Sequence, residues 1–113
     1  MVVLIVEDEP LLRMHTASII DDAGFESFAV GDADSAIEIL ESDTHIDFVF
    51  TDIDLPASMD GIRLSAVIAD RWPPVRLILT SGKYHPGATA LPEGLPFLSK
   101  PYAPHRLVAL LRG

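Results

Sequence analysis

The chain has 113 residues, of which 49% are apolar; it carries a net charge of −9 and contains no cysteine. This length suits one hydrophobic core, so we expect a single domain over residues 1–113. The acidic balance argues against direct binding to nucleic acid, because neutralising phosphates requires clustered Lys and Arg. No apolar run approaches the ~20 residues that cross a bilayer, and a chain without cysteine has no disulfides or thiolate metal sites. We therefore expect a cytoplasmic protein with no membrane contact.

Short apolar runs rich in β-branched and aromatic residues predict the strands. The clearest lies in the stretch 46–56, IDFVFTDIDLP, where residues 48–50 are typical of a strand buried on both faces of a parallel sheet. That strand should end near Asp52, and Pro56 prevents further pairing. Comparable runs predict four other strands, at 2–6, 25–30, 75–80 and 95–99.

Apolar residues at helical spacing lie between these strands. Gly24 provides a stop for the first helix, Asp32 can N-cap the second, and Pro104 can open the last. Another helix is expected at 62–72, before two consecutive helix-breaking prolines. The apolar faces of the four helices consist of Leu12, Ile19, Ile20 and Ala23; Ala33, Ala36, Ile37 and Leu40; Leu64, Val67 and Ile68; and Leu107, Val108, Leu110 and Leu111.

One crossover departs from this alternation. The segment 83–94 should hold a further helix, but it contains Pro86, Gly87, Pro92 and Gly94. We therefore expect this fourth crossover helix to be short or irregular. The alternation of strands and helices elsewhere predicts an α/β fold, with a parallel sheet covered by helices on both faces.

Polar side chains follow four of the five predicted strands. Glu7 and Asp8 follow the first strand, Asp52 the third, Thr80 the fourth and Lys100 the fifth. Because the carboxyl ends of parallel strands meet at one edge of the sheet, these groups should converge there. Two like charges ~4 Å apart repel by about 4 kcal/mol at an effective dielectric near 20, so such a cluster needs a cation. Oxygen ligands alone favour Mg²⁺, and the set suits a phosphoryl group carried on a carboxylate.

Four motifs stand in order at these strand ends: VEDEP, TDIDLP followed by MDG, ILTSG, and FLSKPY. With them, the chain resembles a response-regulator receiver domain over residues 2–111. The resemblance implies a flavodoxin-like, doubly wound sheet of five parallel strands in the order 2-1-3-4-5. It also implies a signalling switch of a two-component system rather than an enzyme. Such a switch takes a phosphoryl group from a partner histidine kinase or histidine phosphotransfer protein, and then changes its surface toward a downstream protein target that the sequence does not identify.

The resemblance assigns roles to the acidic residues. Asp52 would be the phosphoacceptor and would also contact Mg²⁺. Asp8 would ligate Mg²⁺ directly, and Glu7 would act through the metal or its bound water. Asp54 would offer its main-chain carbonyl as a further metal ligand.

The resemblance also assigns roles at the last two strands. Thr80 would bond one phosphoryl oxygen and Lys100 another. Phe97 stands where the family carries a switch aromatic that turns inward as the threonine moves, although core packing explains a lone aromatic equally well. The bond between Lys100 and Pro101 would be cis, which costs little before proline.

Three features depart from the family pattern. The loop 52–61 is one residue longer than usual, which would reshape the rim of the pocket. Asp54 adds a carboxylate beside the expected path of attacking water, and our hypothesis is that it alters the rate of autodephosphorylation. The weak support for a helix at 83–94 leaves the usual output geometry in doubt.

Two other functions remain as alternatives. The pair Asp52 and Asp54 resembles the DxD of haloacid-dehalogenase-type phosphohydrolases, but that family usually places the motif on its first strand. Its later acidic motif would have to follow Lys100, where this chain has no Asp or Glu. The other alternative is a receiver-like binding module that does not need phosphate, against which the intact acceptor, acid pair, Thr80 and Lys100 all argue.

Overall fold

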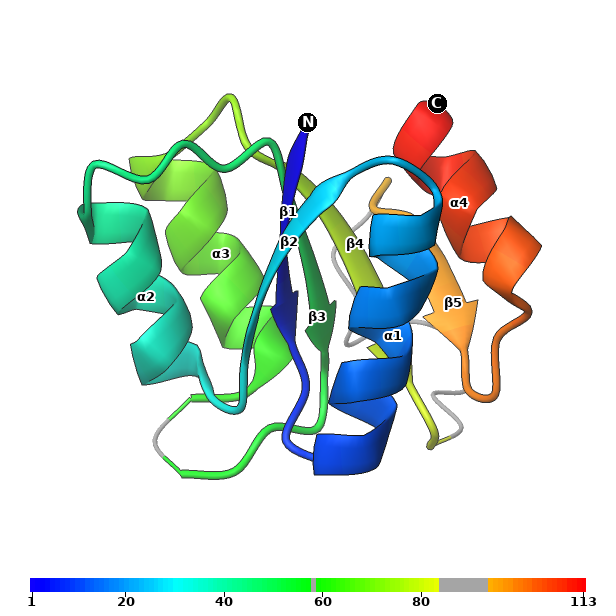
Figure 1. Ribbon diagram of the computed structural model, residues 1–113. Helices are drawn as coiled ribbons and strands as arrows, with labels where there is room; N and C mark the ends of the chain where they lie inside the picture. The colour runs from blue at the N-terminus through cyan, green and yellow to red at the C-terminus, as the bar shows by residue number, and fades with distance from the viewer. Residues whose placement is uncertain (58, 84–93) are drawn as a thin grey trace.

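A computed structural model describes residues 1–57, 59–83 and 94–113 of the chain. Five strands and four helices follow one another in these parts (Figure 1). They are β1 (Val2–Val6), α1 (Pro10–Asp22), β2 (Glu26–Val30), α2 (Ala33–Glu41), β3 (Phe48–Asp52), α3 (Gly61–Arg71), β4 (Arg76–Ser81), β5 (Phe97–Ser99) and α4 (Pro104–Arg112).

The strands form one parallel sheet in the order β2-β1-β3-β4-β5. Every residue of β3 is buried, which is why its sequence is a nearly unbroken apolar run rather than an alternating one. Strand β2 lies at an edge of the sheet and is correspondingly more exposed. The predicted fold class, strand order and flavodoxin-like architecture are confirmed.

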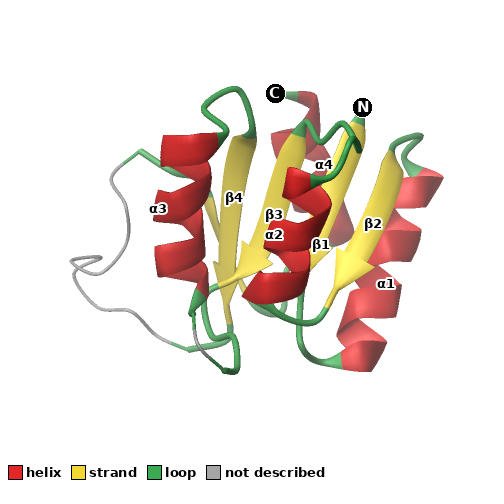
Figure 2. Cartoon of the chain, turned by 90° about the vertical axis from the view of Figure 1, so that its left-hand side faces the viewer, coloured by secondary structure: helices red, strands yellow, loops and turns green. Residues whose placement is uncertain are grey.

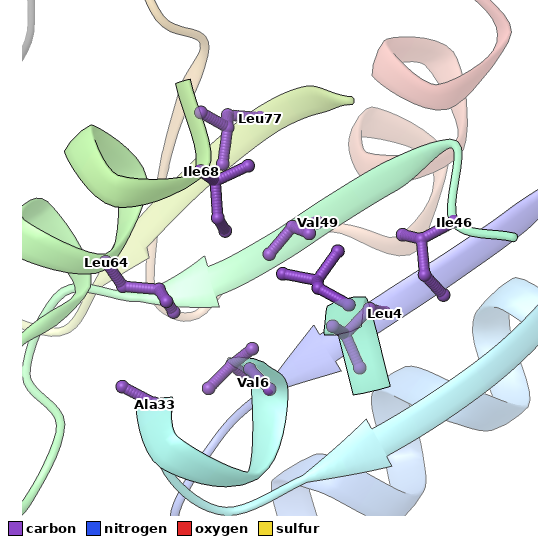
Figure 3. Close-up of a cluster of buried hydrophobic side chains, with 10 residues drawn as sticks. Leu4, Val6, Ala33, Ile46, Val49, Leu64, Ile68 and Leu77 are labelled. Atoms are coloured by element: carbon purple, nitrogen blue, oxygen red, sulfur yellow. The ribbon is translucent and has the colours of Figure 1, made fainter. Parts of the chain in front are cut away.

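Two hydrophobic cores lie on opposite faces of the sheet. Helices α2 and α3 cover one face, and α1 and α4 cover the other (Figures 1 and 2). Successive residues of a strand point to opposite faces, so Leu4 and Val6 enter the first core while Val3 and Ile5 enter the second. In Figure 3, Val49 lies among Leu4, Leu64 and Ile68 in the first core. The two cores fix the sheet between its helices, and thereby fix the edge at which the strands end.

Several predicted boundaries are wrong by one or two residues. Strand β2 begins at Glu26 rather than at 25, because the N–H of Phe25 bonds the carbonyl of Ile20 at the end of α1. Strand β5 begins at Phe97 rather than at 95, because Pro96 has no N–H and contributes only its carbonyl to Leu79.

The other shifts concern β4 and α3. Strand β4 starts at Arg76 rather than at 75 and runs on to Ser81. Helix α3 begins at Gly61, which the sequence placed in the loop, because Asp60 is its N-cap and accepts the N–H of Arg63. The irregular crossover predicted at 83–94 lies, apart from its two ends, outside the described residues.

Local signals at three helix boundaries are confirmed. Gly24 follows α1 with a φ of 94°, a conformation that favours glycine. Asp32 caps α2 by accepting the N–H of Ser35 at 2.8 Å. Pro104 opens α4, and the preceding Lys100–Pro101 bond is cis as expected. Within the described residues, none of the helices is long and apolar enough to span a membrane.

Candidate functional site

Three carboxylates meet where β1 and β3 end. Asp52 is the last residue of β3, and Glu7 and Asp8 directly follow β1. One oxygen from each of Glu7, Asp8 and Asp52 lies within 4.8 Å of the others. Glu7 and Asp52 are both only 4% exposed, whereas Asp8 is exposed. The predicted convergence of these acids is confirmed, and their oxygen-only donor set fits a hard divalent cation.

Lys100 joins this cluster from the end of β5. Its Nζ lies 2.6 Å from Oε1 of Glu7 and 2.7 Å from Oδ2 of Asp52. Burial acts to lower the pKa of Lys100, but the hydrogen bonds to Asp52 and Glu7, together with their charges, raise it overall. The ammonium therefore stays charged, and it offsets part of the repulsion between the two buried carboxylates.

The remaining oxygens of the buried acids accept main-chain hydrogen bonds. Oε2 of Glu7 accepts the N–H of Glu9 at 3.0 Å, and Oδ1 of Asp52 accepts the N–H of Asp54 at 3.0 Å. Burial raises the pKa of Glu7, against the lowering effect of its bonds from Lys100 and Glu9. Within the described chain, the Asp8 carboxylate makes no hydrogen bond or ion pair, so of the three acids it is the most open to a ligand.

Thr80 is paired with Asp52 in the register of β3 and β4, yet its hydroxyl faces away toward β5. Thr80 is 2% exposed, and its Oγ1 donates to the carbonyl of Leu98 at 2.7 Å. Phe97, next to Leu98, is half-buried at the start of β5. The hydroxyl of Thr80 is thus bonded to the strand that carries Phe97. In the register of β4 and β5, Phe97 pairs with Leu79, one residue before Thr80.

Asp54 lies on the rim of the site, and its carboxylate is held by the end of β4. Oδ2 of Asp54 accepts the hydroxyl of Ser81 at 2.6 Å, and Nζ of Lys83 lies 3.8 Å from Oδ1. The sequence pointed to Asp54 as an unusual acid but gave no indication of these two partners. In the same long loop, Ala57 has a φ of 70°, which is uncommon for a residue other than glycine.

A hollow opens beside the acids, on the side of the loop after β3. Its volume is about 580 Å³, and it is lined by the polar residues Asp8, Asp54, Asp60 and Lys83 and by apolar residues of that loop and of the first turn of α3. Because Asp8 belongs both to this hollow and to the acidic cluster, the hollow gives solvent and small ligands a way to the cluster.

Comparison with known proteins identifies the family. The family model described as "Response regulator receiver domain" matches residues 3–112. The chain belongs to this family. Receiver domains are signalling switches and are in general not classical enzymes.

Curated relatives of this receiver domain include regulators and sensors. The chain is 34% identical to a putative response regulator of Rickettsia bellii, described as NtrX-like, and 31% identical to the nitrogen assimilation regulatory protein NtrX of Azorhizobium caulinodans. These matches cover 97% and 96% of the chain but 24% of each relative. The chain thus spans about a quarter of the length of these relatives. Sensor protein TorS of Escherichia coli is 35% identical over 66% of the chain and 8% of its own length.

Solved structures agree with this receiver fold. A response regulator receiver protein from Sinorhizobium medicae is 28% identical, with a TM-score of 0.89 over 98% of this chain and 90% of its own. The receiver domain of an HD domain-containing protein from Pseudomonas fluorescens gives the same identity, coverage and TM-score.

Proposed function

We propose that this receiver domain accepts a phosphoryl group on Asp52 from the histidine of a partner kinase or phosphotransfer protein. The observation that carries the proposal is the buried Asp52 carboxylate, which ends a central strand with the Lys100 ammonium 2.7 Å away. In the transfer, the phosphorus–nitrogen bond of the donor breaks as an oxygen–phosphorus bond to Asp52 forms. The donor imidazole leaves with the electron pair of the broken bond, and Lys100 is placed to offset charge on a phosphoryl oxygen.

The acids around Asp52 would hold a Mg²⁺ ion. We assign Asp8 and Asp52 as direct ligands, the main-chain carbonyl of Asp54 as another, and Glu7 as a group acting through the metal or its water. The open carboxylate of Asp8 and the fully engaged carboxylate of Glu7 support this division. Bound there, Mg²⁺ would neutralise charge on the transferring phosphoryl group.

The same proposal includes a switch at β4 and β5. A phosphoryl oxygen near Asp52 would compete with the carbonyl of Leu98 for the hydroxyl of Thr80. Because that bond joins Thr80 to the strand that carries Phe97, its exchange would alter the surface at β5. We propose that Phe97 turns inward in this exchange and that a downstream protein reads the altered surface.

Asp54 would set the lifetime of the phosphoryl group. A carboxylate near the acceptor can take a proton from an attacking water, which shortens the life of an aspartyl phosphate. Here Ser81 and Lys83 hold the Asp54 carboxylate at the end of β4. We expect Asp54→Ala to lengthen the lifetime, and Ser81→Ala, which releases the carboxylate, to shorten it. Radiolabel loss from the purified phosphoprotein would measure both, and equal lifetimes in all three proteins would remove Asp54 from this role.

Intact mass measurement tests the central proposal. The protein is incubated with a small phosphoryl donor, with and without Mg²⁺, beside Asp52→Asn and the matched variant Asp54→Asn. We expect a gain of one phosphoryl group that requires Mg²⁺, is lost in Asp52→Asn and is kept in Asp54→Asn. Labelling that persists in Asp52→Asn would move the acceptor elsewhere. Folded protein that stays unlabelled, also with a phosphorylated histidine donor, would favour the phosphate-independent binding module instead.

No specific observation favours the phosphohydrolase alternative. In that chemistry, the second Asp of the motif acts as a general acid on the leaving group. The Asp54 carboxylate is instead engaged at the end of β4, where it accepts the hydroxyl of Ser81 and lies 3.8 Å from Nζ of Lys83. We therefore do not propose turnover of a phosphomonoester.

A further inference from the structure

Arg13 of α1 reaches back to the main chain of the acidic pair. Its Nη1 donates to the carbonyl oxygen of Glu7 at 2.9 Å, and the side chain is half-buried. Within the described residues, Arg13 takes part in no ion pair, and its charged guanidinium instead donates to this carbonyl. A hydrogen bond from a charged donor is stronger than one between neutral groups.

The carbonyl that Arg13 holds belongs to the peptide unit between Glu7 and Asp8. A peptide unit is planar, so holding this carbonyl also sets the direction of the Asp8 N–H. It thereby restrains the two flanking dihedrals, ψ of Glu7 and φ of Asp8. The other polar groups of Glu7 are also bound: its N–H to Val30, Oε2 to Glu9 and Oε1 to Lys100. Arg13 thus completes the set of contacts that orient both acids toward Asp52.

Gly31 leaves the space in which the guanidinium lies. A Cβ added at Gly31 would come within 2.9 Å of Nη1 of Arg13, which is too close for the two to coexist without movement. The φ of Gly31 is not positive, so the backbone there does not itself require glycine. Since the clashing atom is the end of a flexible side chain, an alanine at 31 would displace Arg13 rather than unfold the protein.

We propose that Arg13 is a positioning residue for the Glu7–Asp8 pair, and that Gly31 serves to admit its side chain. This inference rests on the proposed binding of Mg²⁺ by the acidic cluster. Arg13 does not touch the cation; it sets the direction from which the two carboxylates meet it. Outer contacts of this kind typically contribute roughly 10- to 100-fold to metal affinity.

The test compares Mg²⁺ affinity, measured by calorimetric titration, in Gly31→Ala, Arg13→Met and the double variant. Gly31→Ala keeps the positive charge but displaces it, whereas Arg13→Met removes the charge altogether. Loss of a positive charge near a cation site would by itself strengthen binding, so weaker binding in Arg13→Met reports lost orientation. The matched control is Arg63→Met, which removes the same charge from an exposed position on α3.

We expect both single variants to bind Mg²⁺ roughly tenfold more weakly, and the double variant to bind no more weakly than Arg13→Met. Arg63→Met should bind as the wild type does. Affinity unchanged in both single variants would overturn the inference, as would two losses that simply add in the double variant. A urea unfolding curve for each protein shows that the comparison is between folded proteins.

A second readout separates this inference from the proposed function. The N–H of Glu9 bonds Oε2 of Glu7, so its hydrogen exchange in metal-free protein reports how firmly Glu7 is held. We expect faster exchange in Gly31→Ala and Arg13→Met than in the wild type and Arg63→Met. If the wild type bound no Mg²⁺, the proposed metal site would fail, while equal Glu9 exchange in all variants would refute the positioning role by itself.

Discussion

A buried pair of hydroxyls gives the sharpest test of how this fold is held together. The hydroxyls of Thr16, in α1, and Tyr102, after β5, lie 2.7 Å apart. Thr16 is fully buried, and the Tyr102 ring packs edge-on against Phe50 with centroids 5.4 Å apart. The pair therefore joins α1, the central strand β3 and the segment that follows Lys100. Tyr102→Phe and Thr16→Val each remove one hydroxyl and keep the shape of the side chain.

The cost of each change follows from what its partner can do next. A buried polar group left without its partner costs ~1–3 kcal/mol. Thr16 lies within a helix, so after Tyr102→Phe its hydroxyl can turn to the carbonyl of Leu12, four residues earlier, and we expect a loss near ~1 kcal/mol. Burial raises the pKa of Tyr102, which marks its hydroxyl as poorly hydrated, so Thr16→Val should cost closer to ~2 kcal/mol.

Replacing both hydroxyls removes the unpaired group that each single change leaves behind. The double variant should therefore lose less than the sum of the single losses, by about 1–2 kcal/mol. Urea unfolding of the four proteins gives these free energies, and the exposed Ser18→Ala on the same helix serves as a control expected within about 0.5 kcal/mol of the wild type. Losses that add in the double variant would show that the two hydroxyls contribute independently, and the reasoning would be wrong.

Three other predictions concern the ends of the strands. Gly61→Ala should destabilise the protein by about 3 kcal/mol or more in urea unfolding, because a Cβ there would overlap the rigid main-chain carbonyl of Asp52. The hydrogen bond from the N–H of Val2 holds the pKa of Asp47 below its usual value, so the stability that this carboxylate adds is present above about pH 4 and lost as pH falls through its folded pKa. Between about pH 5 and pH 3, the free energy of unfolding should therefore fall less in Asp47→Asn than in the wild type. Parallel curves of unfolding free energy against pH in the two proteins would contradict this. Mg²⁺ at about 100 times its dissociation constant should stabilise the wild type by roughly 2.7 kcal/mol in thermal unfolding, and Asp8→Asn should abolish most of that gain.

The sequence was sufficient for the features that depend on neighbouring residues. An apolar run as continuous as that of β3 has to be buried on both faces, and Asp32 caps a helix through a contact three residues away. Once the strands are parallel, the groups at their carboxyl ends share an edge without any further information. The meeting of Glu7, Asp52 and Lys100 could therefore be predicted from order and spacing alone.

Contacts between distant side chains could not be predicted in this way. From the sequence, Arg13 is an ordinary solvated charge on a helix. The residues next to it in the chain indicate neither its partner on the preceding loop nor the space left at Gly31. The hydroxyls of Thr16 and Tyr102 are separated by 86 residues, so only the packing of α1 against the end of the sheet brings them together. Thr16 also interrupts the apolar stripe of its helix, which is why the sequence gave no reason to place it in the core.

The charges at the site explain why Lys100 bridges two acids rather than one. Glu7, Asp8 and Asp52 bring three negative charges within 4.8 Å of one another, and Lys100 returns one positive charge. The remaining two negative charges match the two positive charges of a divalent cation, which suits Mg²⁺ at this cluster. A phosphoryl group on Asp52 would draw Lys100 toward its new oxygens and away from Glu7. The contact between Lys100 and Glu7 is thus expected to be strongest in the unphosphorylated protein, where it holds the acid pair in place until the phosphoryl group arrives.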